Sequence, residues 1–183
     1  MKPNVIAIVG QTASGKTTLA RYLESTGFQR IVTYTTRPMR DGEKDGSDYH
    51  FLQEAQFLKM LEEGFFAEHT DYHAKFGHVC YGTGRESLEA SEQRRKVIVL
   101  NPCGVMALKD AGYDIFVVYL DIDQATLMRR ALNRGDSPAE IGRRIAEDAR
   151  LFRALEAGNY DNLRITDAEL LPNQIADMIF EAL

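Results

Sequence analysis

Residues 5–18 read Val5-Ile6-Ala7-Ile8-Val9-Gly10-Gln11-Thr12-Ala13-Ser14-Gly15-Lys16-Thr17-Thr18. An apolar run of strand length leads directly into the pattern G-x-x-x-x-G-K-S/T, and a segment of helical period follows it. Glycines in such a turn let backbone N–H groups point at phosphate oxygens, and the start of the helix adds its positive end. The stretch predicts a phosphate loop at residues 10–18 that binds a nucleoside triphosphate. We expect Lys16 to contact the outer phosphates and the Thr17 hydroxyl to ligate Mg²⁺.

Strand-length apolar runs alternate with helical segments along the rest of the chain, which is typical of an α/β fold with a mainly parallel sheet flanked by helices. The expected strands are 5–9, 29–33, 97–100, 115–120 and 163–166. The expected helices are 17–25, 53–63, 85–94, 104–111, 123–133, 138–157 and 168–182. The helix start at Ser137-Pro138-Ala139-Glu140 is the clearest, because it offers a capping hydroxyl, a proline at the first helical position and a carboxylate at the third.

The composition is that of one globular domain of 183 residues, with 22 Lys and Arg against 27 Asp and Glu and a net charge of −5. This charge argues against nucleic acid as a partner, because general phosphate-backbone binding needs a basic surface. The longest apolar runs are strand-sized and fall short of the roughly 20 residues of a membrane span. The N-terminus enters a strand almost at once, without room for a leader, so we expect a cytoplasmic protein. Cys80 and Cys103 form no disulfide framework, and we expect reduced thiols.

Residues 35–95 break the α/β pattern, because they are rich in Gly, Tyr, His and charge. We expect short extended pieces there rather than buried strands, and we interpret the stretch as an inserted subdomain. The turn around Asn133-Arg134-Gly135-Asp136 is a second candidate insertion.

The loop from Thr33 to Tyr49 contains Arg37 and Arg40 among several hydroxyl side chains. Paired guanidinium groups beside hydroxyls are suited to a phosphate dianion, since each guanidinium can bind two oxygens. A second phosphate site beside the first indicates phosphoryl transfer.

The segment from Thr35 to Tyr49 resembles the guanylate kinase family, because it meets every fixed position of the signature T-T-R-x-x-R-x-G-E-x-x-G-x-D-Y. Weaker correspondences extend the resemblance over roughly residues 4 to 170; they are Glu68, Tyr81-Gly82-Thr83, residues 130–135 and Arg143-Arg144. The resemblance implies a P-loop kinase fold with a core (1–34, 96–126 and 149–183), a monophosphate-binding subdomain (35–95) and a short lid (127–148). It also implies ATP- and Mg²⁺-dependent phosphorylation of GMP or dGMP.

The resemblance further implies a role for each matching residue. The acceptor phosphate would be held by Arg37, Arg40, Tyr49 and Tyr81, with Thr83 nearby. Glu68 would accept from N1–H and the amino group of guanine, and Thr33 stands where the family has a serine near the base carbonyl. Transfer itself would depend on Lys16, Arg37 and the lid arginines Arg130, Arg134 and Arg144.

The sequence departs from the family at Asn101, which stands where the family has an aspartate that helps hold the base and the water of the metal. The stretch between Glu68 and Tyr81 is also a few residues longer than usual. The departure at Asn101 leaves open a kinase of this fold that acts on another monophosphate or a ribose phosphate. A separate and less favoured alternative is a non-catalytic module that binds a phosphorylated ligand, since such modules typically lose the phosphate-loop lysine, whereas Gly15-Lys16-Thr17 is complete here. Small-molecule nucleotides are the expected partners, of a monomer or a homodimer.

A metal site is a further possibility in the longer stretch, at His69, His73, His78 and Cys80. Their spacing fits no zinc pattern, and surface residues of a hairpin are the preferred interpretation.

Overall fold

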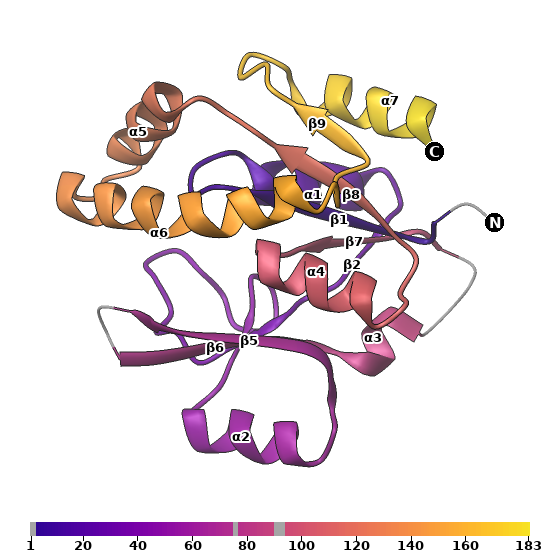
Figure 1. Cartoon of the computed structure of the whole chain (residues 1–183), viewed down its shortest axis with the longest axis vertical. Coiled ribbons are helices and arrows are strands. Elements are labelled where there is room, and N and C mark those ends of the chain that lie inside the picture. The colour runs from indigo at the N-terminus through magenta and orange to yellow at the C-terminus, as the bar shows by residue number, and fades with distance from the viewer. Residues whose placement is uncertain (1–2, 75–76, 90–93) are drawn as a thin grey trace.

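The protein is described by a computed structural model that covers residues 3–74, 77–89 and 94–183. Its elements, in chain order, are β1 (Val5–Gly10), α1 (Lys16–Ser25), β2 (Gln29–Arg30), β3 (Tyr34–Thr35), β4 (His50–Phe51), α2 (Glu54–Glu62), β5 (Phe66–Ala74), β6 (Gly77–Gly84), α3 (Arg85–Glu89), β7 (Lys96–Val99), α4 (Pro102–Asp110), β8 (Ile115–Leu120), α5 (Gln124–Asn133), α6 (Pro138–Ala157), β9 (Leu163–Ile165) and α7 (Pro172–Ala182). Figure 1 shows the chain as a helix-flanked sheet with a second sheet beside it.

The core sheet has five strands in the order β2-β7-β1-β8-β9, and every pairing in it is parallel. Strand β1 lies in the middle of this order, with Ile6 opposite Val97 of β7 on one side and Phe116 of β8 on the other. All six residues of β1 and all six of β8 are buried. The predicted parallel sheet is confirmed, and its five strands lie where the apolar runs placed them, although β2 is only two residues long.

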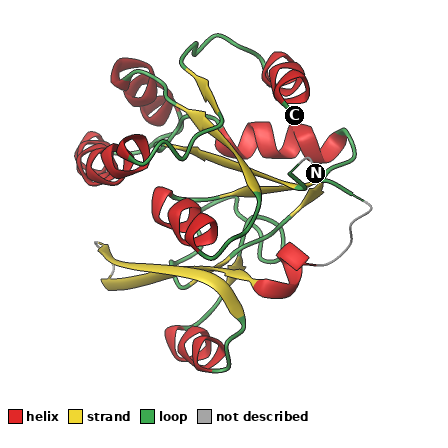
Figure 2. Cartoon of the chain, turned by 45° about the vertical axis from the view of Figure 1, so that its right-hand side comes forward, coloured by secondary structure: helices red, strands yellow, loops and turns green. Residues whose placement is uncertain are grey.

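Alternate residues of β1 face two different hydrophobic clusters, because successive side chains of a strand point to opposite faces. Ile6 and Ile8 pack with residues of α1 and α7, whereas Ala7 and Val9 pack with residues of α4 and α6. Helices therefore cover both faces of the sheet, as Figures 1 and 2 show. Burial on both faces explains why β1 and β8 are continuous apolar runs in the sequence.

A second sheet, in the order β4-β3-β6-β5, is formed between residues 34 and 84. Strands β5 and β6 make a long antiparallel hairpin, and α2 covers it by stacking the fully buried Phe57 on Phe66 at 4.4 Å between ring centroids. The expectation of short extended pieces without buried strands is wrong here, since β5 has nine residues and Val79 and Cys80 on β6 are buried. Polar and aromatic residues interrupt the apolar alternation that would have predicted these strands.

Three expected elements differ in extent. The last helix begins at Pro172 rather than at residue 168, because a proline is tolerated in the first turn of a helix and not in its interior. The helix expected over 85–94 is described over Arg85–Glu89, and residues 90–93 lie outside the described residues. The candidate insertion around 133–136 is a short turn between Asn133, which ends α5, and Pro138, the predicted start of α6.

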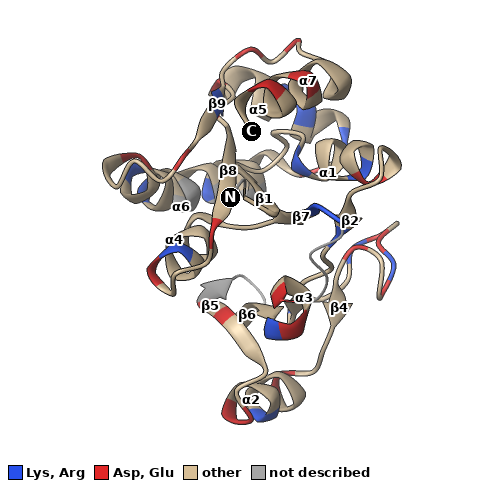
Figure 3. Cartoon of the chain, turned by 90° about the vertical axis from the view of Figure 1, so that its right-hand side faces the viewer, with Lys and Arg blue, Asp and Glu red and all other residues tan. Residues whose placement is uncertain are grey.

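Both cysteines are free thiols. Within the described ranges, no helix is both long enough and apolar enough to cross a membrane. Lys and Arg are interspersed with Asp and Glu on the face that Figure 3 presents.

Candidate active site: a phosphate loop and an arginine cluster in one cavity

The phosphate loop leaves the carboxyl end of β1 and ends in the first turn of α1. A Cβ at Gly10 would lie 2.5 Å from Ser14 Oγ and 2.9 Å from the backbone oxygen of Leu120, so a side chain cannot be accommodated at this position. Gly15 has φ +102° and forms the N-cap of α1, in a backbone conformation that favours glycine. Gly10 is thus required because neighbouring atoms approach it closely, and Gly15 is required because of its left-handed backbone conformation.

Lys16 lies across the loop, where its Nζ donates to the backbone oxygens of Gly10 at 2.7 Å and Gln11 at 2.8 Å. Its ammonium group is therefore held at the loop, beside the positive end of α1. Ser14 Oγ and Gln11 Oε1 are buried and have no hydrogen-bond partner among the residues that the structure describes. Buried polar atoms normally find partners, so the protein alone leaves part of the hydrogen-bonding capacity of this loop unused.

One cavity of about 550 Å³ joins the phosphate loop to the predicted acceptor residues. Of the predicted site residues, it is lined by Thr12, Ala13, Ser14, Gly15, Lys16, Thr17, Thr18, Thr33, Arg37, Arg40, Tyr49, Tyr81, Arg130 and Arg134. Segments that are more than a hundred residues apart in the sequence thus meet around one space. Gly10, Gln11, Glu68, Thr83 and Asn101 are predicted site residues that do not line this cavity, and the last three form a separate group described below.

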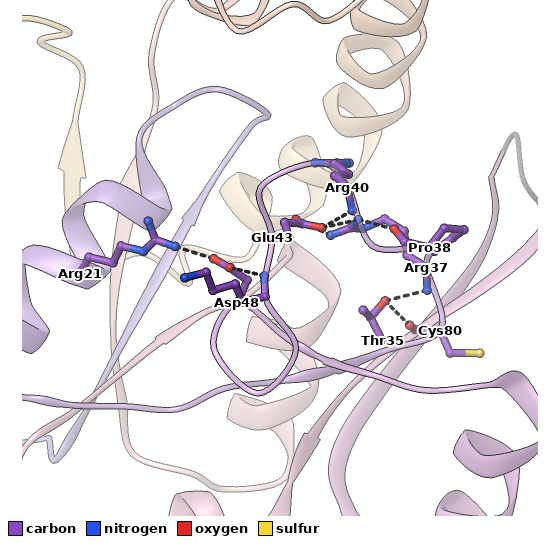
Figure 4. Close-up of polar contacts among 9 residues, drawn as sticks. Arg21, Thr35, Arg37, Pro38, Arg40, Glu43, Asp48 and Cys80 are labelled. Atoms are coloured by element: carbon purple, nitrogen blue, oxygen red, sulfur yellow. Dashed lines mark hydrogen bonds and ion pairs between the residues drawn. The ribbon is translucent and has the colours of Figure 1, made fainter.

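Arg37 is held by a carboxylate within the cavity wall. Its Nη1 and Nη2 donate to the two oxygens of Glu43 at 2.9 and 2.8 Å, and its guanidinium carbon lies 5.3 Å from the ring centre of Tyr49. The backbone N–H of Arg40 donates to the same Glu43 carboxylate at 2.7 Å (Figure 4). Burial opposes the charge on Arg37, but the hydrogen bond and charge of Glu43 prevail and raise the pKa of Arg37. Glu43 thereby orients a permanently charged, nearly buried guanidinium.

The loop that carries these arginines is fixed to β6. The Thr35 hydroxyl donates to the backbone oxygen of Cys80 at 3.0 Å and accepts from the backbone N–H of Arg37 at 3.1 Å. The Thr36 hydroxyl accepts from the backbone N–H of Cys80 at 2.8 Å. The two threonines of the signature therefore position the backbone just before Arg37.

Tyr49 and Tyr81 face each other beside Arg37, with ring centroids 5.9 Å apart. Burial, together with the neighbouring Tyr81 hydroxyl, raises the pKa of Tyr49 to about 12. The phenol of Tyr49 therefore stays neutral over the physiological range and keeps an O–H donor that suits a phosphate oxygen.

Glu68 and Thr83 form a second polar cluster, close to Gly104 in the first turn of α4. The Thr83 hydroxyl donates to Glu68 Oε1 at 2.6 Å, and Glu68 Oε2 lies 3.2 Å from where a Cβ at Gly104 would stand. Glu68 is only 7% exposed, and burial raises its pKa to about 7 against the opposing hydrogen bond from Thr83. This carboxyl can change its charge near neutral pH.

Asn101 is the N-cap of α4. Its Oδ1 accepts from the backbone N–H of Gly104 at 2.7 Å, and its Nδ2 donates to Thr70 Oγ1 at 2.8 Å. Both ends of the amide are therefore engaged within the protein, and Asn101 ties the start of α4 to β5 beside Glu68. The predicted contact of Asn101 with the substrate stays a prediction.

Of the three arginines predicted to act from the lid, Arg130 and Arg134 have described side chains, and their partners differ. The Arg130 guanidinium reaches the backbone oxygen of Ser14 at 3.5 Å and also donates to the backbone oxygen of Ala168, so it bridges the phosphate loop and the β9–α7 connection. Arg134 pairs with Asp136 at the α5–α6 turn. Arg144 lies on α6, and its side chain is outside the described part of the structure.

The histidines of the predicted hairpin lie on β5 and β6, where His69 is exposed and His78 is half-buried. The interpretation as surface residues is wrong for Cys80, which is buried because it packs under α2 with Phe57 and Phe66. His78 contacts Glu54 Oε1 through Nδ1 at 2.7 Å and Asp71 Oδ2 through Nε2 at 3.0 Å, and these carboxylates raise its pKa. Among the described residues, no cluster of three His, Cys, Asp or Glu side chains could hold a metal ion, and the side chain of His73 is outside them.

Sequence reasoning missed Glu43 as a site residue, although a signal was present. Glu43 is a fixed position of the signature, and it lies three residues beyond Arg40 and six beyond Arg37. An acidic side chain at a fixed position beside two arginines of a phosphate-binding loop is suited to orienting their guanidinium groups. Asp48 is likewise a fixed position of the signature, whereas Arg21, which pairs with it from α1, gave no such signal.

A phosphate loop on the central strand of a parallel sheet shares one cavity with paired arginines from the loop between β3 and β4 of the second sheet. This combination of fold and site defines a phosphotransferase of the nucleoside monophosphate kinase class. A family model described as guanylate kinase matches residues 2–170. The chain belongs to the guanylate kinase family.

Individual relatives agree with this assignment. The chain is 30% identical over 173 residues to the guanylate kinase of Bdellovibrio bacteriovorus, a match that spans 91% of this chain and 90% of the relative. It is 36% identical over 157 residues to the guanylate kinase of Syntrophotalea carbinolica, spanning 82% of this chain and 73% of that one. A crystal structure of guanylate kinase from Anaplasma phagocytophilum has a TM-score of 0.68 at 22% identity, and the match covers 99% of this chain and 87% of that chain. That structure supports the fold, and the predicted P-loop kinase fold is confirmed.

Proposed function

We propose that the 550 Å³ cavity is the place where this guanylate kinase transfers the terminal phosphoryl group of ATP to GMP. The observation that carries the proposal is the single space shared by Lys16 and Thr17 at the donor end and by Arg37, Arg40 and Tyr49 at the acceptor end. In-line transfer requires two phosphate sites in contact, and positioning then supplies much of the rate. The relatives named above are all guanylate kinases, and nothing favours a ribose phosphate acceptor or a non-catalytic module.

The acceptor phosphate would bind at Arg37, Arg40, Tyr49 and Tyr81. Arg37 is already oriented by Glu43, so little side-chain freedom remains to be lost when a phosphate binds. The neutral Tyr49 phenol adds a donor without repelling the dianion.

Charge developing on the transferred phosphoryl group would be stabilised by Lys16 and by the lid arginines. Lys16 Nζ donates to the backbone oxygens of Gly10 and Gln11 at the loop, and it would exchange these neutral acceptors for the charged outer phosphates. Arg130 and Arg134 line the same cavity from the lid side, where Arg144 would join them. Such preorganised cations act without a covalent intermediate.

Mg²⁺ would be held at Thr17. The Thr17 side chain is exposed at the first turn of α1 and lines the cavity, and a single hydroxyl fits an ion that keeps several waters and takes phosphate oxygens as further ligands. When bound, Mg²⁺ neutralises phosphate charge. The protein contributes the fixed position of Thr17 beside Lys16 on one helix.

Guanine would be recognised by Glu68, with Thr83 orienting the carboxylate. An ionised carboxylate offers two acceptors to the adjacent N1–H and amino donors of guanine, a pair that adenine does not present. Thr33 is buried at the cavity wall and would lie near the base carbonyl. Asn101 would act through Thr70 and the start of α4. The oligomeric state, monomer or homodimer, and the cytoplasmic location stay predictions.

A coupled assay of ADP formation with ATP, Mg²⁺ and a panel of GMP, dGMP, AMP, CMP, UMP and IMP tests the proposal. We expect GMP or dGMP to be preferred, and Lys16→Ala to lower kcat by about a thousandfold because it removes a cation aimed at the developing charge. Lys59→Ala, an exposed cation on α2, is the matched control and leaves kcat unchanged. Unchanged turnover in Lys16→Ala, with the circular dichroism spectrum intact, would contradict the assignment of the phosphate loop.

A further inference from the structure

An ion pair joins the helix that begins at the phosphate loop to the loop that carries the acceptor arginines. Arg21 on α1 donates from Nη2 to Asp48 Oδ1 at 2.6 Å (Figure 4). Asp48 lines the central cavity, and its side chain is only 12% exposed. None of the roles proposed above uses this pair.

Asp48 closes the turn that ends at Tyr49. Its Oδ2 accepts from the backbone N–H of Lys44 at 2.9 Å, and its own backbone N–H donates to the backbone oxygen of Lys44 at 2.9 Å. The backbone N–H of Gly46 donates to the backbone oxygen of Tyr49 at 2.8 Å. Because these hydrogen bonds restrict the turn, a displacement of the Asp48 side chain would also displace Tyr49.

A second arginine of the core contacts the neighbouring residue of the turn. Arg30 donates from Nη2 to the backbone oxygen of Ser47 at 2.5 Å, and its Nε pairs with Glu24 of α1 at 3.0 Å. Two consecutive residues, Ser47 and Asp48, are thus held by arginines that are themselves anchored to α1.

The first turn of α1 carries the donor side of the site. Arg21 follows Lys16 by five residues, which is about 7.5 Å along a helix axis. One rigid helix thus has Lys16 at its start and, through Arg21, a contact to the turn that carries Tyr49. We propose that Arg21 is a positioning residue that sets the distance between the donor and acceptor phosphates through Asp48. This inference rests on the roles proposed for Lys16 and Tyr49.

The exposure of Arg21 separates a positioning role from a structural one. The Arg21 side chain is 56% exposed, and the mostly buried Asp48 carboxylate keeps the backbone N–H of Lys44 as a partner when Arg21 is removed, so the loss of this pair should cost little folding stability. Phosphoryl transfer is more demanding, because small displacements of reacting groups cost large factors in rate. Removal of Arg21 should therefore leave the protein folded and slow the reaction.

The first experiment compares Arg21→Ala and Arg21→Lys with the wild-type enzyme. We expect Arg21→Ala to lower kcat/KM for GMP by about tenfold or more. We also expect the KM for ATP to change less than about twofold and the melting temperature to stay within about 2 °C. Arg21→Lys keeps the charge and should retain most of the activity, and Lys59→Ala is the surface control.

A double-mutant cycle identifies the route of the effect. If Arg21 acts through Asp48, Arg21→Ala should add no further loss of kcat/KM for GMP in an Asp48→Asn background. If the two substitutions lower kcat/KM independently, so that their factors multiply, the inference is refuted. A folded Arg21→Ala enzyme with unchanged kinetics would also refute it. In both cases the proposed function still holds as long as the wild-type enzyme phosphorylates GMP. A wild-type enzyme that does not phosphorylate GMP would instead refute the proposed function.

Discussion

Replacing Glu68 by glutamine tests both the burial of this carboxyl and its proposed contact with guanine. Burial raises the pKa of Glu68 from its ordinary 4.5 to about 7. A raised carboxyl pKa means that the folded protein binds more protons than the unfolded chain between these two values. Stability is therefore lost as pH rises from about 4.5 through 7, and the full cost is present above 7. Glutamine at this position carries no charge at any pH and removes that dependence.

The size of the effect follows from the pKa shift. The rise of the pKa from 4.5 to about 7 corresponds to roughly 3 kcal/mol at high pH, of which less than about 1 kcal/mol is already lost at pH 5. Between pH 5 and pH 8.5, the free energy of unfolding of the wild-type protein should thus fall by about 2 to 3 kcal/mol more than that of Glu68→Gln. For a chain of 183 residues, this is about 5 to 10 °C in the difference of melting temperatures.

Urea denaturation at the two pH values measures this difference, with Glu62→Gln, an exposed carboxyl of α2, as the matched control. The comparison is made between pH values, so that any cost of placing an amide beside Gly104 cancels. In parallel, kcat/KM for GMP should fall by about a hundredfold or more in Glu68→Gln, because the amide offers one acceptor in place of two. Equal pH dependence in the two proteins would refute the buried carboxyl, and unchanged kcat/KM for GMP would refute its contact with guanine.

Two further predictions concern the elements that carry the site. Phe57→Ala removes a fully buried ring stacked on β5 and should cost about 3 to 5 kcal/mol in urea denaturation; a cost under 1 kcal/mol would contradict a packed core under α2. Asp123→Ala removes the N-cap of α5, where the carboxylate accepts from the backbone N–H of Thr126 at 2.9 Å. It should cost about 1 kcal/mol, and Asp123→Asn, which keeps an acceptor, should cost clearly less in the same measurement.

The elements that were predicted well are those whose signals are contiguous in the sequence. The strand before Gly10 and the helix from Lys16 follow from one uninterrupted pattern, and α6 begins at Pro138, where capping residues and a proline coincide. The last helix begins at Pro172, later than its apolar periodicity predicts, because a proline is tolerated in the first turn of a helix and not in its interior. The hairpin β5–β6 was not expected to have buried strands, because its face is closed by Phe57 of a separate helix and by residues that do not alternate in hydrophobicity.

In the candidate site, too, the sequence predicted some features and could not predict others. The sequence placed two arginines and two tyrosines at an acceptor phosphate because guanidinium groups and hydroxyls are the chemistry that a dianion needs. It could not reveal that Glu43 holds Arg37 through two hydrogen bonds, since side-chain orientation depends on how the loop closes. Nor could it show that the amide of Asn101 is engaged by Gly104 and Thr70, because the latter lies 31 residues away on another sheet.

The sequence by itself determined the phosphate loop, the parallel core sheet and the family, because these depend on residue types at fixed spacing along a continuous stretch. Only the tertiary structure decided which side chains share one space and which charges are removed from water. The near-neutral pKa of Glu68 and the ion pair of Arg21 with Asp48 both arise from contacts between distant segments. Burial and electrostatic energy depend on distances in space, and only the folded chain sets those distances.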